Sequence, residues 1–417
     1  MNAPIRVAYV YANSWEFAYP QYLGEGFDQA VWCDSDDFIF KYPRAAMPFG
    51  VEPAFYYFSQ TGRSVAEFTH KYGFPMRRIP VRPGSLNREW SLRLFREISR
   101  DKIDLIHFYS YYRNRVLPDL FDLFALYCRL AGLPFVAHYQ VGEFPRTYYG
   151  GIVKRLAIQP RRLVKAWALR SARRIFSLNR LEIESLTNPS HPAYCGLPFD
   201  RRKCVYIPNI VDPDLFFKID KTSARRMTGC DPAIPCLLYV GFLRRDKGVQ
   251  HLINLMPRLL REYPALQLWI LGNGEYETEL RALAEKREVA SQIRFQGPVE
   301  NKKLCPYYNM ADVHLLPSYT ESFGTVLIEA MACGTPSIGT RVGGIPEVLS
   351  DGAGLVVPPR DEEALLGAVR AVLQGSFKPD PAARLRKLAE YSYDSMGRIL
   401  TNAYREALAG HEAEGTP

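Results

Sequence analysis

The chain has 417 residues, of which 47% are hydrophobic and 23% are charged, a composition typical of globular proteins and not of intrinsically disordered ones. The length predicts two or three domains. No apolar run approaches the roughly eighteen residues that a membrane-spanning helix needs. Because the first residues also lack the apolar run and small-residue cleavage site of a signal peptide, we expect a cytoplasmic protein.

The cysteines and histidines form no metal-binding pattern. The eight cysteines are scattered without a Cys-x-x-Cys pair, which excludes the familiar zinc and thioredoxin spacings and favours reduced thiols. The seven histidines include no His-x-x-x-His pair. We therefore expect neither a resident metal nor a cofactor.

The formal net charge of +9 comes from one part of the chain, because residues 151–205 hold twelve basic and three acidic side chains. Such a local basic surface suggests an anionic partner and argues against nucleic-acid binding by the protein as a whole. A helix predicted over residues 160–174 is basic and contains a tryptophan, so residues 152–174 could lie on the inner face of an anionic membrane. In the alternative interpretation, the helix is solvated and its apolar stripe packs on a sheet. The stripe comprises Leu163, Val164, Trp167 and Ser171.

Short apolar runs alternate with helix-length segments along the chain, as is typical of parallel α/β architecture. The strands expected in the first half are residues 6–11, 105–109, 135–138 and 174–178. The strands expected in the second half are residues 236–241, 267–271, 292–296, 313–316, 336–339 and 354–357. The helices expected between them are residues 250–262, 275–287, 302–309, 326–332 and 362–373, with a last helix at 392–408 and a frayed end at 410–417.

The fold class that this pattern predicts is α/β, with two doubly wound parallel sheets facing across a cleft. A proline-bearing connector at residues 207–216 divides the chain. The aromatic-rich stretch 36–82 has no clear period, and we interpret it as an irregular loop over packed aromatic side chains. The alternative is a stacking surface for a carbohydrate or an apolar acceptor.

The most informative run extends from Glu321 to Glu329 and follows a predicted strand, so it opens a helix at the carboxyl edge of a sheet. Gly324 would let a ligand approach the backbone, and the amides of residues 323–326 would form an anion site. If the residues between the two carboxylates were helical, about 12 Å would separate them, which is too far for a glycosidase pair. The alternative is that Glu321 caps the helix and Glu329 is solvated.

Three more loops follow predicted strands. Residues 241–248 contain Arg244, Arg245 and Lys247, which are placed to neutralise an anion unless the loop is simply a basic surface. Residues 271–274 read Leu-Gly-Asn-Gly and lack the third glycine of a dinucleotide fingerprint. Residues 339–348 form a glycine-containing flexible loop.

In their order and spacing, the motifs of residues 236–373 resemble the nucleotide-binding domain of retaining glycosyltransferases of family 4, which have the GT-B fold. The motifs are Val240-Gly241 with Lys247-Gly248, Leu271 to Gly274, Phe295 to Gly297, Leu316 to Ser318, Glu321 to Gly324, Glu329 to Gly334, and Gly343-Gly344 with Glu347. In the first half the resemblance is limited to Asp104 to His107, the strand ending at His138, Arg173 to Ser177, and Ile207 to Asn209 with Val211-Asp212. It implies a first domain at 1–208, a nucleotide-sugar-binding domain at 209–390 and a helix at 391–410 that crosses back to the first domain.

The resemblance also implies roles for single residues. Glu329 would bind the donor ribose, and Lys247 would neutralise the leaving diphosphate. Glu321, with the amides of Phe323 and Gly324, would hold the transferred sugar, which His138 would face at the reacting centre. Further donor contacts are implied for Gly241, Arg244, Gly274 and Thr325, and acceptor contacts for Gly24 and Gly26. Phe242 and Ile210 depart from the family pattern. Phe242 stands where the family has a phosphate-binding arginine, which Arg244 or Arg245 would replace.

As a whole, the resemblance implies a retaining, metal-independent hexosyltransferase with a front-face mechanism. The expected donor is a UDP-hexose of the glucose or N-acetylglucosamine type, and the acceptor is a hydroxyl of a glycan, a lipid-linked or a small molecule. One alternative is a mannosyltransferase that uses GDP-mannose. Another is a non-catalytic protein that binds a nucleotide sugar or an anionic surface.

Overall fold

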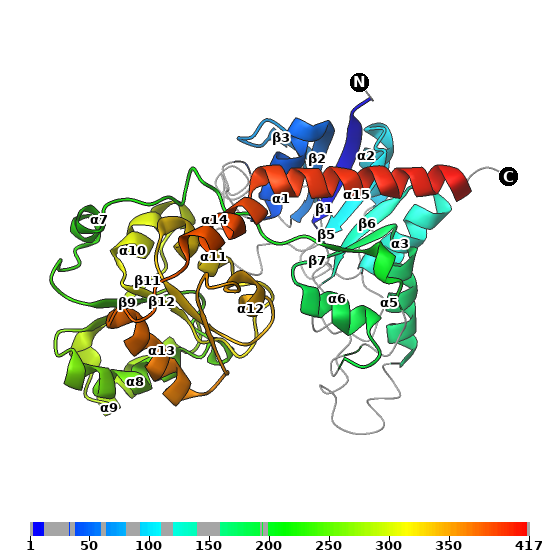
Figure 1. Ribbon diagram of the computed structural model, residues 1–417. Coiled ribbons are helices and arrows are strands. Elements are labelled where there is room, and N and C mark those ends of the chain that lie inside the picture. The colour runs from blue at the N-terminus through cyan, green and yellow to red at the C-terminus, as the bar shows by residue number, and fades with distance from the viewer. Residues whose placement is uncertain are drawn as a thin grey trace. The chain divides into compact units, whose positions relative to one another are not determined.

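The computed structural model describes residues 3–11, 33, 38–59, 64–80, 92–109, 120–139, 159–191, 194 and 199–414. The chain divides into two compact units, each of which is built on one sheet with helices packed on it (Figure 1). Unit 1 comprises residues 1–208 and 393–417, and unit 2 comprises residues 209–392. None of the described helices combines the length and the apolar character that crossing a membrane requires.

Unit 1 contains an eight-stranded sheet of order β3-β4-β2-β1-β5-β6-β7-β8. The strands are β1 Ile5–Tyr11, β2 Val51–Ser59, β3 Ala66–Thr69, β4 Pro75–Pro80, β5 Leu105–Tyr109, β6 Phe135–Tyr139, β7 Arg174–Ser177 and β8 Cys204–Tyr206. The helices are α1 Phe38–Ala46, η4 Met47–Phe49, α2 Leu92–Arg100, α3 Leu120–Leu130, α5 Gln159–Ser171, α6 Arg180–Thr187, η5 Arg201–Lys203 and α15 Tyr393–Glu414. The expected parallel sheet is confirmed except at one edge, where β3 pairs antiparallel with β4.

The interpretation of residues 36–82 as an irregular loop is wrong. The described part of this stretch folds into α1, η4 and the strands β2, β3 and β4. Its aromatic side chains at positions 40, 42, 55, 56, 57 and 58 are buried in unit 1, so they form core instead of a stacking surface. The pattern was hidden because β2 is covered on both faces and shows no alternation, while α1 contains Pro43.

Two helix boundaries differ from the predicted ones. Helix α5 ends at Ser171, three residues before the predicted end, and the chain then enters β7. The buried face of α5 carries Ala166 and Leu169, whereas Leu163 and Val164 are exposed, so the predicted packing stripe is wrong for these two residues. Helix α15 continues to Glu414 and includes residues that were expected to be frayed.

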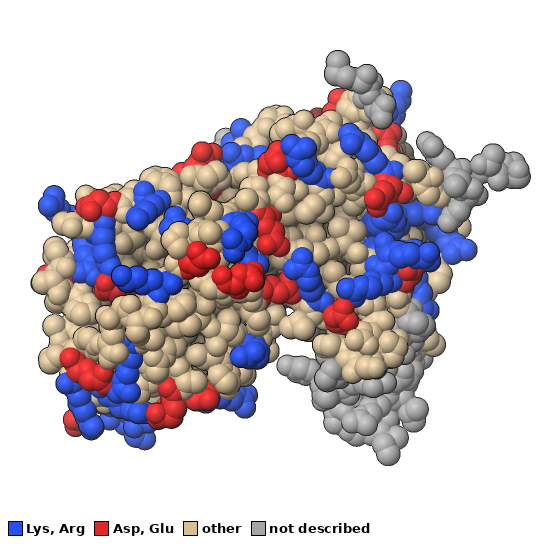
Figure 2. Space-filling view, viewed as in Figure 1, with Lys and Arg blue, Asp and Glu red and all other residues tan. Residues whose placement is uncertain are grey.

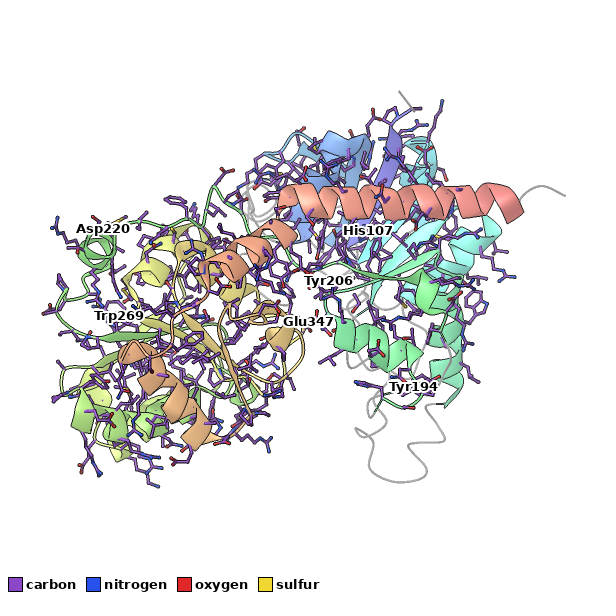
Figure 3. The ribbon with its side chains drawn as sticks, viewed as in Figure 1. His107, Tyr194, Tyr206, Asp220, Trp269 and Glu347 are labelled. Atoms are coloured by element: carbon purple, nitrogen blue, oxygen red, sulfur yellow. The ribbon has the colours of Figure 1, made fainter. Side chains whose placement is uncertain are left out.

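Helix α15 packs against α1 and η4 of unit 1. Beneath it, Tyr404 Oη lies 2.6 Å from His107 Nδ1 and 3.0 Å from Tyr9 Oη, and Figure 3 labels His107 beside this helix. All three side chains are fully buried. Because buried polar groups are costly without partners, this cluster favours one docked position of the C-terminal helix on the sheet of unit 1.

Unit 2 contains a six-stranded, wholly parallel sheet of order β11-β10-β9-β12-β13-β14. The strands are β9 Cys236–Val240, β10 Gln267–Leu271, β11 Ile293–Gly297, β12 Val313–Leu316, β13 Ser337–Thr340 and β14 Leu355–Val357. The longer helices are α7 Lys221–Thr228, α8 Val249–Glu262, α9 Glu277–Lys286, α11 Thr325–Cys333, α13 Glu362–Leu373 and α14 Pro381–Glu390. The shorter ones are η6 Arg245–Lys247, η7 Ala290–Gln292, η8 Asn301–Lys303, α10 Cys305–Met310 and α12 Ile345–Val348. The predicted helix at 302–309 is therefore divided between η8 and α10.

The strand order of unit 2 reverses between β9 and β12, which are neighbours in the sheet. In open α/β sheets, a crevice for ligands forms outside the carboxyl ends of the strands at such a switch point. The loops that follow β9 and β12 are residues 241–248 and 317–324. The topology thus brings together two of the loops that were selected from the sequence.

Replacing Gly397 on α15 by alanine is expected to lower the free energy of unfolding by about 1–3 kcal/mol, because the added methyl group overpacks the interface with α1. A Cβ atom there would lie 2.1 Å from Ala45 O and 2.4 Å from a ring carbon of Phe49. Gly410, on the same helix, has no described atom within 4 Å of an added Cβ. Gly410→Ala is the control and should be neutral or slightly stabilising. Denaturant unfolding followed by circular dichroism compares them, and equal stability would contradict the close packing.

Candidate functional site

Backbone contacts hold the loops at the switch point of unit 2 together. The Tyr319 N–H donates to Asp246 O over 2.7 Å, which joins the β12 loop to the β9 loop. Gly248 has φ 71°, and a Cβ atom there would lie 2.0 Å from Pro317 O. Gly343, in the loop after β13, has φ 51°, and its Cβ would lie 1.5 Å from Glu321 O. Only glycine fits these two positions, and the result is a backbone framework around Glu321.

Lys247 and Glu321 meet within this framework. Lys247 Nζ lies 2.8 Å from Glu321 Oε2, and the two side chains are 17% and 19% exposed. The other carboxylate oxygen of Glu321 accepts the N–H of Ser322 over 3.2 Å. The N-cap of α11 is Gly324, which has no side-chain cap hydrogen bond, so the alternative that Glu321 caps this helix is wrong. The site instead holds a mostly buried ion pair beside a helix start.

Asp246 organises the cations of the β9 loop. Arg244 donates two hydrogen bonds to its carboxylate over 2.9 and 2.8 Å, and Thr320 Oγ1 donates a third over 2.9 Å. Burial alone would raise the pKa of Asp246, but these hydrogen bonds and the charges of Arg244 and Lys247 lower it below its usual range. Asp246 was not among the residues predicted from the sequence, although a carboxylate inside a run of basic residues is a visible signal.

The two arginines that were expected to replace the one missing at Phe242 have protein partners. Arg244 is paired with Asp246, as described. Arg245 is 74% exposed, and its guanidinium lies 4.6 Å from the ring centre of Tyr276. The Phe242 side chain is 54% exposed. Among the cations of the β9 loop, Lys247 is the one held against Glu321.

The start of α11 presents backbone groups. Gly324 is left-handed, with φ 88° and ψ 54°, and the first amides of any α-helix lack intrahelical acceptors and attract anions. Thr325 Oγ1 accepts a hydrogen bond from Asn209 Nδ2 over 2.7 Å. The Phe323 ring is buried and packs edge-on against Tyr391, with the ring centres 5.4 Å apart. Phe323 can therefore offer a ligand its backbone and not its ring.

Glu329 lies on α11 and is only 4% exposed, so the alternative of a solvated helix residue is wrong. Its carboxylate accepts hydrogen bonds from Tyr308 Oη over 2.7 Å and from Asn301 Nδ2 over 3.3 Å. Burial, reinforced by the Glu329 charge, raises the pKa of Tyr308 well above its usual value. The phenol therefore remains a donor. Tyr308 was not predicted from the sequence, where its only signal is its place on the helix before β12.

Gly241 and Gly274 lie on the adjoining loops after β9 and β10. The Gly241 N–H donates to Leu271 O over 3.0 Å. A Cβ atom on Gly274 would lie 2.2 Å from Leu243 O. The two glycines hold the β9 and β10 loops in contact, and both loops lie at the same edge of the sheet as Lys247.

His138 belongs to unit 1, where it lies near the carboxyl end of β6 and is 6% exposed. Its ring centre lies 4.7 Å from that of His107, 4.9 Å from that of Tyr109 and 5.3 Å from that of Tyr42. Within the described part of the chain, its Nε2 has no hydrogen-bond partner. Burial lowers the pKa of His138 to about 3, so this imidazole is neutral near pH 7.

The acceptor-side glycines Gly24 and Gly26 lie outside the described residues, as do residues 152–158 of the predicted membrane segment. The structure therefore brings Lys247, Glu321 and the start of α11 together within unit 2. Among the described residues, no group of three or more His, Cys, Asp or Glu side chains could hold a metal ion.

Comparison with protein families places unit 2 among known domains. Residues 220–393 match the family described as Glycosyl transferases group 1. The D-inositol 3-phosphate glycosyltransferase of Geodermatophilus obscurus is 35% identical over 218 residues, which are 50% of this chain and 48% of that protein. The glycogen synthase of Mycobacterium tuberculosis is 35% identical over 178 residues, 42% of this chain and 43% of that protein. The chain thus matches about half the length of these relatives and carries a group 1 glycosyltransferase domain.

A solved structure extends the likeness to both units. The Anabaena protein HepE, crystallised with UDP-glucose, matches 96% of this chain and 99% of its own with a TM-score of 0.67 and 15% identity. At this identity the likeness concerns the fold. The fold class is therefore that of GT-B glycosyltransferases, with two parallel-sheet α/β domains.

Replacing Tyr308 by phenylalanine is expected to lower the free energy of unfolding by about 1–3 kcal/mol, because the buried Glu329 carboxylate loses a charge-assisted hydrogen bond. Tyr307→Phe on the same helix is the matched control, since the Tyr307 ring packs on Trp269 with ring centres 6.2 Å apart. Thermal and denaturant unfolding measure both variants. Equal stabilities would show that the Tyr308–Glu329 bond contributes nothing.

Proposed function

We propose, from the premise that residues 220–393 form a group 1 glycosyltransferase domain, that the protein is a retaining glycosyltransferase. It transfers a hexose of the glucose or N-acetylglucosamine type from a UDP-sugar to a hydroxyl group of a glycan, a lipid-linked or a small-molecule acceptor. The observation that carries the proposal is the Lys247–Glu321 pair beside the start of α11 at the switch point of unit 2. The complex of HepE with UDP-glucose supports the choice of donor.

In this proposal, Lys247 and the first amides of α11 bind the donor diphosphate. An ammonium group and a helix N-terminus both stabilise negative charge, and the charge on the diphosphate grows as it leaves. Lys247 then supplies the positive charge that a divalent cation supplies elsewhere, so transfer needs no metal. Glu329 binds the ribose hydroxyls while Tyr308 orients its carboxylate, and Glu321 binds the hydroxyls of the transferred sugar. Backbone contacts with the donor come from Gly241, Gly274, Phe323 and Gly324.

Transfer proceeds by front-face displacement. The bond between the anomeric carbon and the diphosphate oxygen breaks, and the acceptor oxygen forms its bond on the same face. The acceptor proton passes to the leaving diphosphate. His138 is neutral, because burial lowers its pKa to about 3, and it acts as a hydrogen-bonding group and not as a cation. The protein contributes positioning and charge stabilisation.

Two alternatives keep the same site. GDP-mannose would use the same diphosphate and sugar contacts with a different base. The second alternative is a protein that binds a nucleotide sugar without turnover. The exposed Phe242 in the β9 loop favours it, because phenylalanine lacks the second phosphate contact that an arginine at this position would make.

A membrane surface is the proposed setting of the acceptor reaction. Helices α3 and α5 pack together and leave Leu126, Leu130, Leu163 and Val164 exposed. The sequence of α5 carries four basic and no acidic residues. Figure 2 shows Lys and Arg side chains gathered on the part of unit 1 below the C-terminal end of α15. Exposed leucines beside cations suit the interface of an anionic bilayer.

A thermal-shift and hydrolysis screen against UDP- and GDP-sugars, with and without EDTA, tests the donor. We expect one UDP-hexose to raise the unfolding temperature and to be hydrolysed slowly with or without chelator.

Lys247→Met should lower kcat/KM by about 100- to 1,000-fold, the usual effect of removing one group that stabilises transition-state charge. The control is Lys286→Met, an exposed lysine at the end of α9. Full activity of Lys247→Met would refute the diphosphate role, and EDTA-sensitive turnover would refute the metal-free mechanism.

Flotation with phosphatidylserine-containing and pure phosphatidylcholine vesicles tests the membrane surface. We expect binding to the anionic vesicles that weakens as salt rises. Leu130→Gln combined with Leu163→Gln should weaken it about tenfold, because two exposed leucines no longer enter the interface. Leu385, 65% exposed on α14 of unit 2, provides the control Leu385→Gln. Binding that is insensitive to the unit 1 changes would refute this surface.

A further inference from the structure

The phenol of Tyr319 belongs to a chain of half-buried polar side chains. Gln250 Nε2 donates to Tyr319 Oη over 2.6 Å, and Tyr319 Oη lies 2.5 Å from His251 Nε2. His251 Nδ1 lies 2.6 Å from Glu362 Oε1, which also accepts from Asn254 Nδ2 over 2.9 Å. We call Gln250, Tyr319, His251 and Glu362 the Tyr319 network. It joins the β12 loop to α8 and to the first residue of α13.

The donors and acceptors of the Tyr319 network have one consistent direction. When Glu362 is ionised and His251 is neutral, the imidazole proton lies on Nδ1 and donates to the carboxylate, and Nε2 accepts from the tyrosine. Burial raises the pKa of Tyr319 against the opposing charge of Arg360, and the phenol therefore stays a donor. The guanidinium of Arg360 also lies 4.5 Å from the centre of the Tyr319 ring. These contacts restrict both the hydroxyl and the ring.

Tyr319 begins the segment that carries the ion pair of the candidate site. Its N–H donates to Asp246 O over 2.7 Å, the next residue, Thr320, donates to the Asp246 carboxylate, and Glu321 follows. Lys247 Nζ reaches both Glu321 Oε2 over 2.8 Å and Thr320 O over 3.4 Å. Only two peptide units therefore separate the tyrosine from Glu321.

Helices α8 and α13 also make contacts outside the Tyr319 network. These two helices are also joined at their surface by the ion pairs Arg258–Glu363 and Glu262–Arg370. Buried apolar residues of both helices, such as Ile253 and Leu366, supply the packing. What the network adds is a fixed place for one hydroxyl group of the β12 loop.

We propose that His251 and Glu362 are positioning residues of the donor site. They hold Tyr319, and through it they place Glu321 and Lys247 for the sugar and the diphosphate. The inference rests on the proposed function and extends it to side chains on α8 and α13. The Tyr319 network would then have a role in transfer in addition to any role in the packing of α8 and α13.

Calorimetric titration with UDP and steady-state hydrolysis of UDP-glucose test the inference on the full chain. Tyr319→Phe and His251→Leu should each lower kcat/KM about fivefold or more, the effect of losing one hydrogen bond. The double variant should be little worse than His251→Leu, because both changes break one network. Glu362→Gln keeps an acceptor oxygen and should restore most of the activity that Glu362→Leu loses.

Two controls separate positioning from stability. Ile253→Val removes one methylene from the buried face of α8 and should cost stability comparable to that of the network variants, yet leave kcat/KM unchanged. Arg258→Met removes a surface ion pair between the same helices and should also leave it unchanged. Three results would overturn the inference but leave the proposed function standing. They are an equal loss of kcat/KM in the two controls, an additive loss in the double variant, and an unchanged kcat/KM in Tyr319→Phe. A wild-type protein that neither binds UDP nor hydrolyses UDP-glucose would overturn the proposed function and the inference with it.

Discussion

The candidate site depends on one constraint, which is that backbone segments after three parallel strands touch each other directly. Side chains cannot fill the contacts at Gly248 and Gly343, where a Cβ atom would lie 2.0 and 1.5 Å from carbonyl oxygens of neighbouring loops. The loops after β9, β12 and β13 therefore have little freedom to separate. Because Lys247 and Glu321 extend from this framework, their meeting follows from the strand order together with the glycines. A ligand would find these charges already in place.

The charges of unit 2 are balanced locally before any ligand arrives. Lys247 is paired with Glu321, and Arg244 with Asp246. In the proposed reaction, the diphosphate takes Lys247 and the sugar hydroxyls take Glu321, so one partner is exchanged for another and neither charge is left alone in a mostly buried site. Because Lys247 and Glu321 lose most of their water when the protein folds, most of the free-energy cost of desolvation arises before the donor binds. This limits the reorganisation needed during transfer.

Strands β2, β3, β4 and β8 were not predicted from the sequence. The sequence predicted the other ten described strands within one residue, because buried parallel strands are short apolar runs bounded by turn residues. It also selected Lys247 and Glu321, but not their pairing, since contact across 74 positions depends on strand order. Tyr308 and His251 were missed because their partners, Glu329 and Glu362, lie 21 and 111 positions away in the chain. The stretch 36–82 was misread because strands covered on both faces do not alternate. A count of the basic residues in 151–205 also could not show which of them have partners within the fold.

Part of that basic excess is structural. Arg174 pairs with Glu406 of α15 over 2.8 Å, and Lys203 Nζ donates to Arg170 O in the last turn of α5 and to Ala172 O just beyond it. The two units thus treat charge differently. Unit 1 pairs Arg174 within the fold and keeps His138 uncharged by burial, whereas unit 2 holds paired ions at its switch point. The proposed mechanism passes the acceptor proton to the leaving diphosphate. It therefore needs a neutral hydrogen-bonding group from unit 1, such as His138, and charged groups from unit 2, such as Lys247 and Glu321.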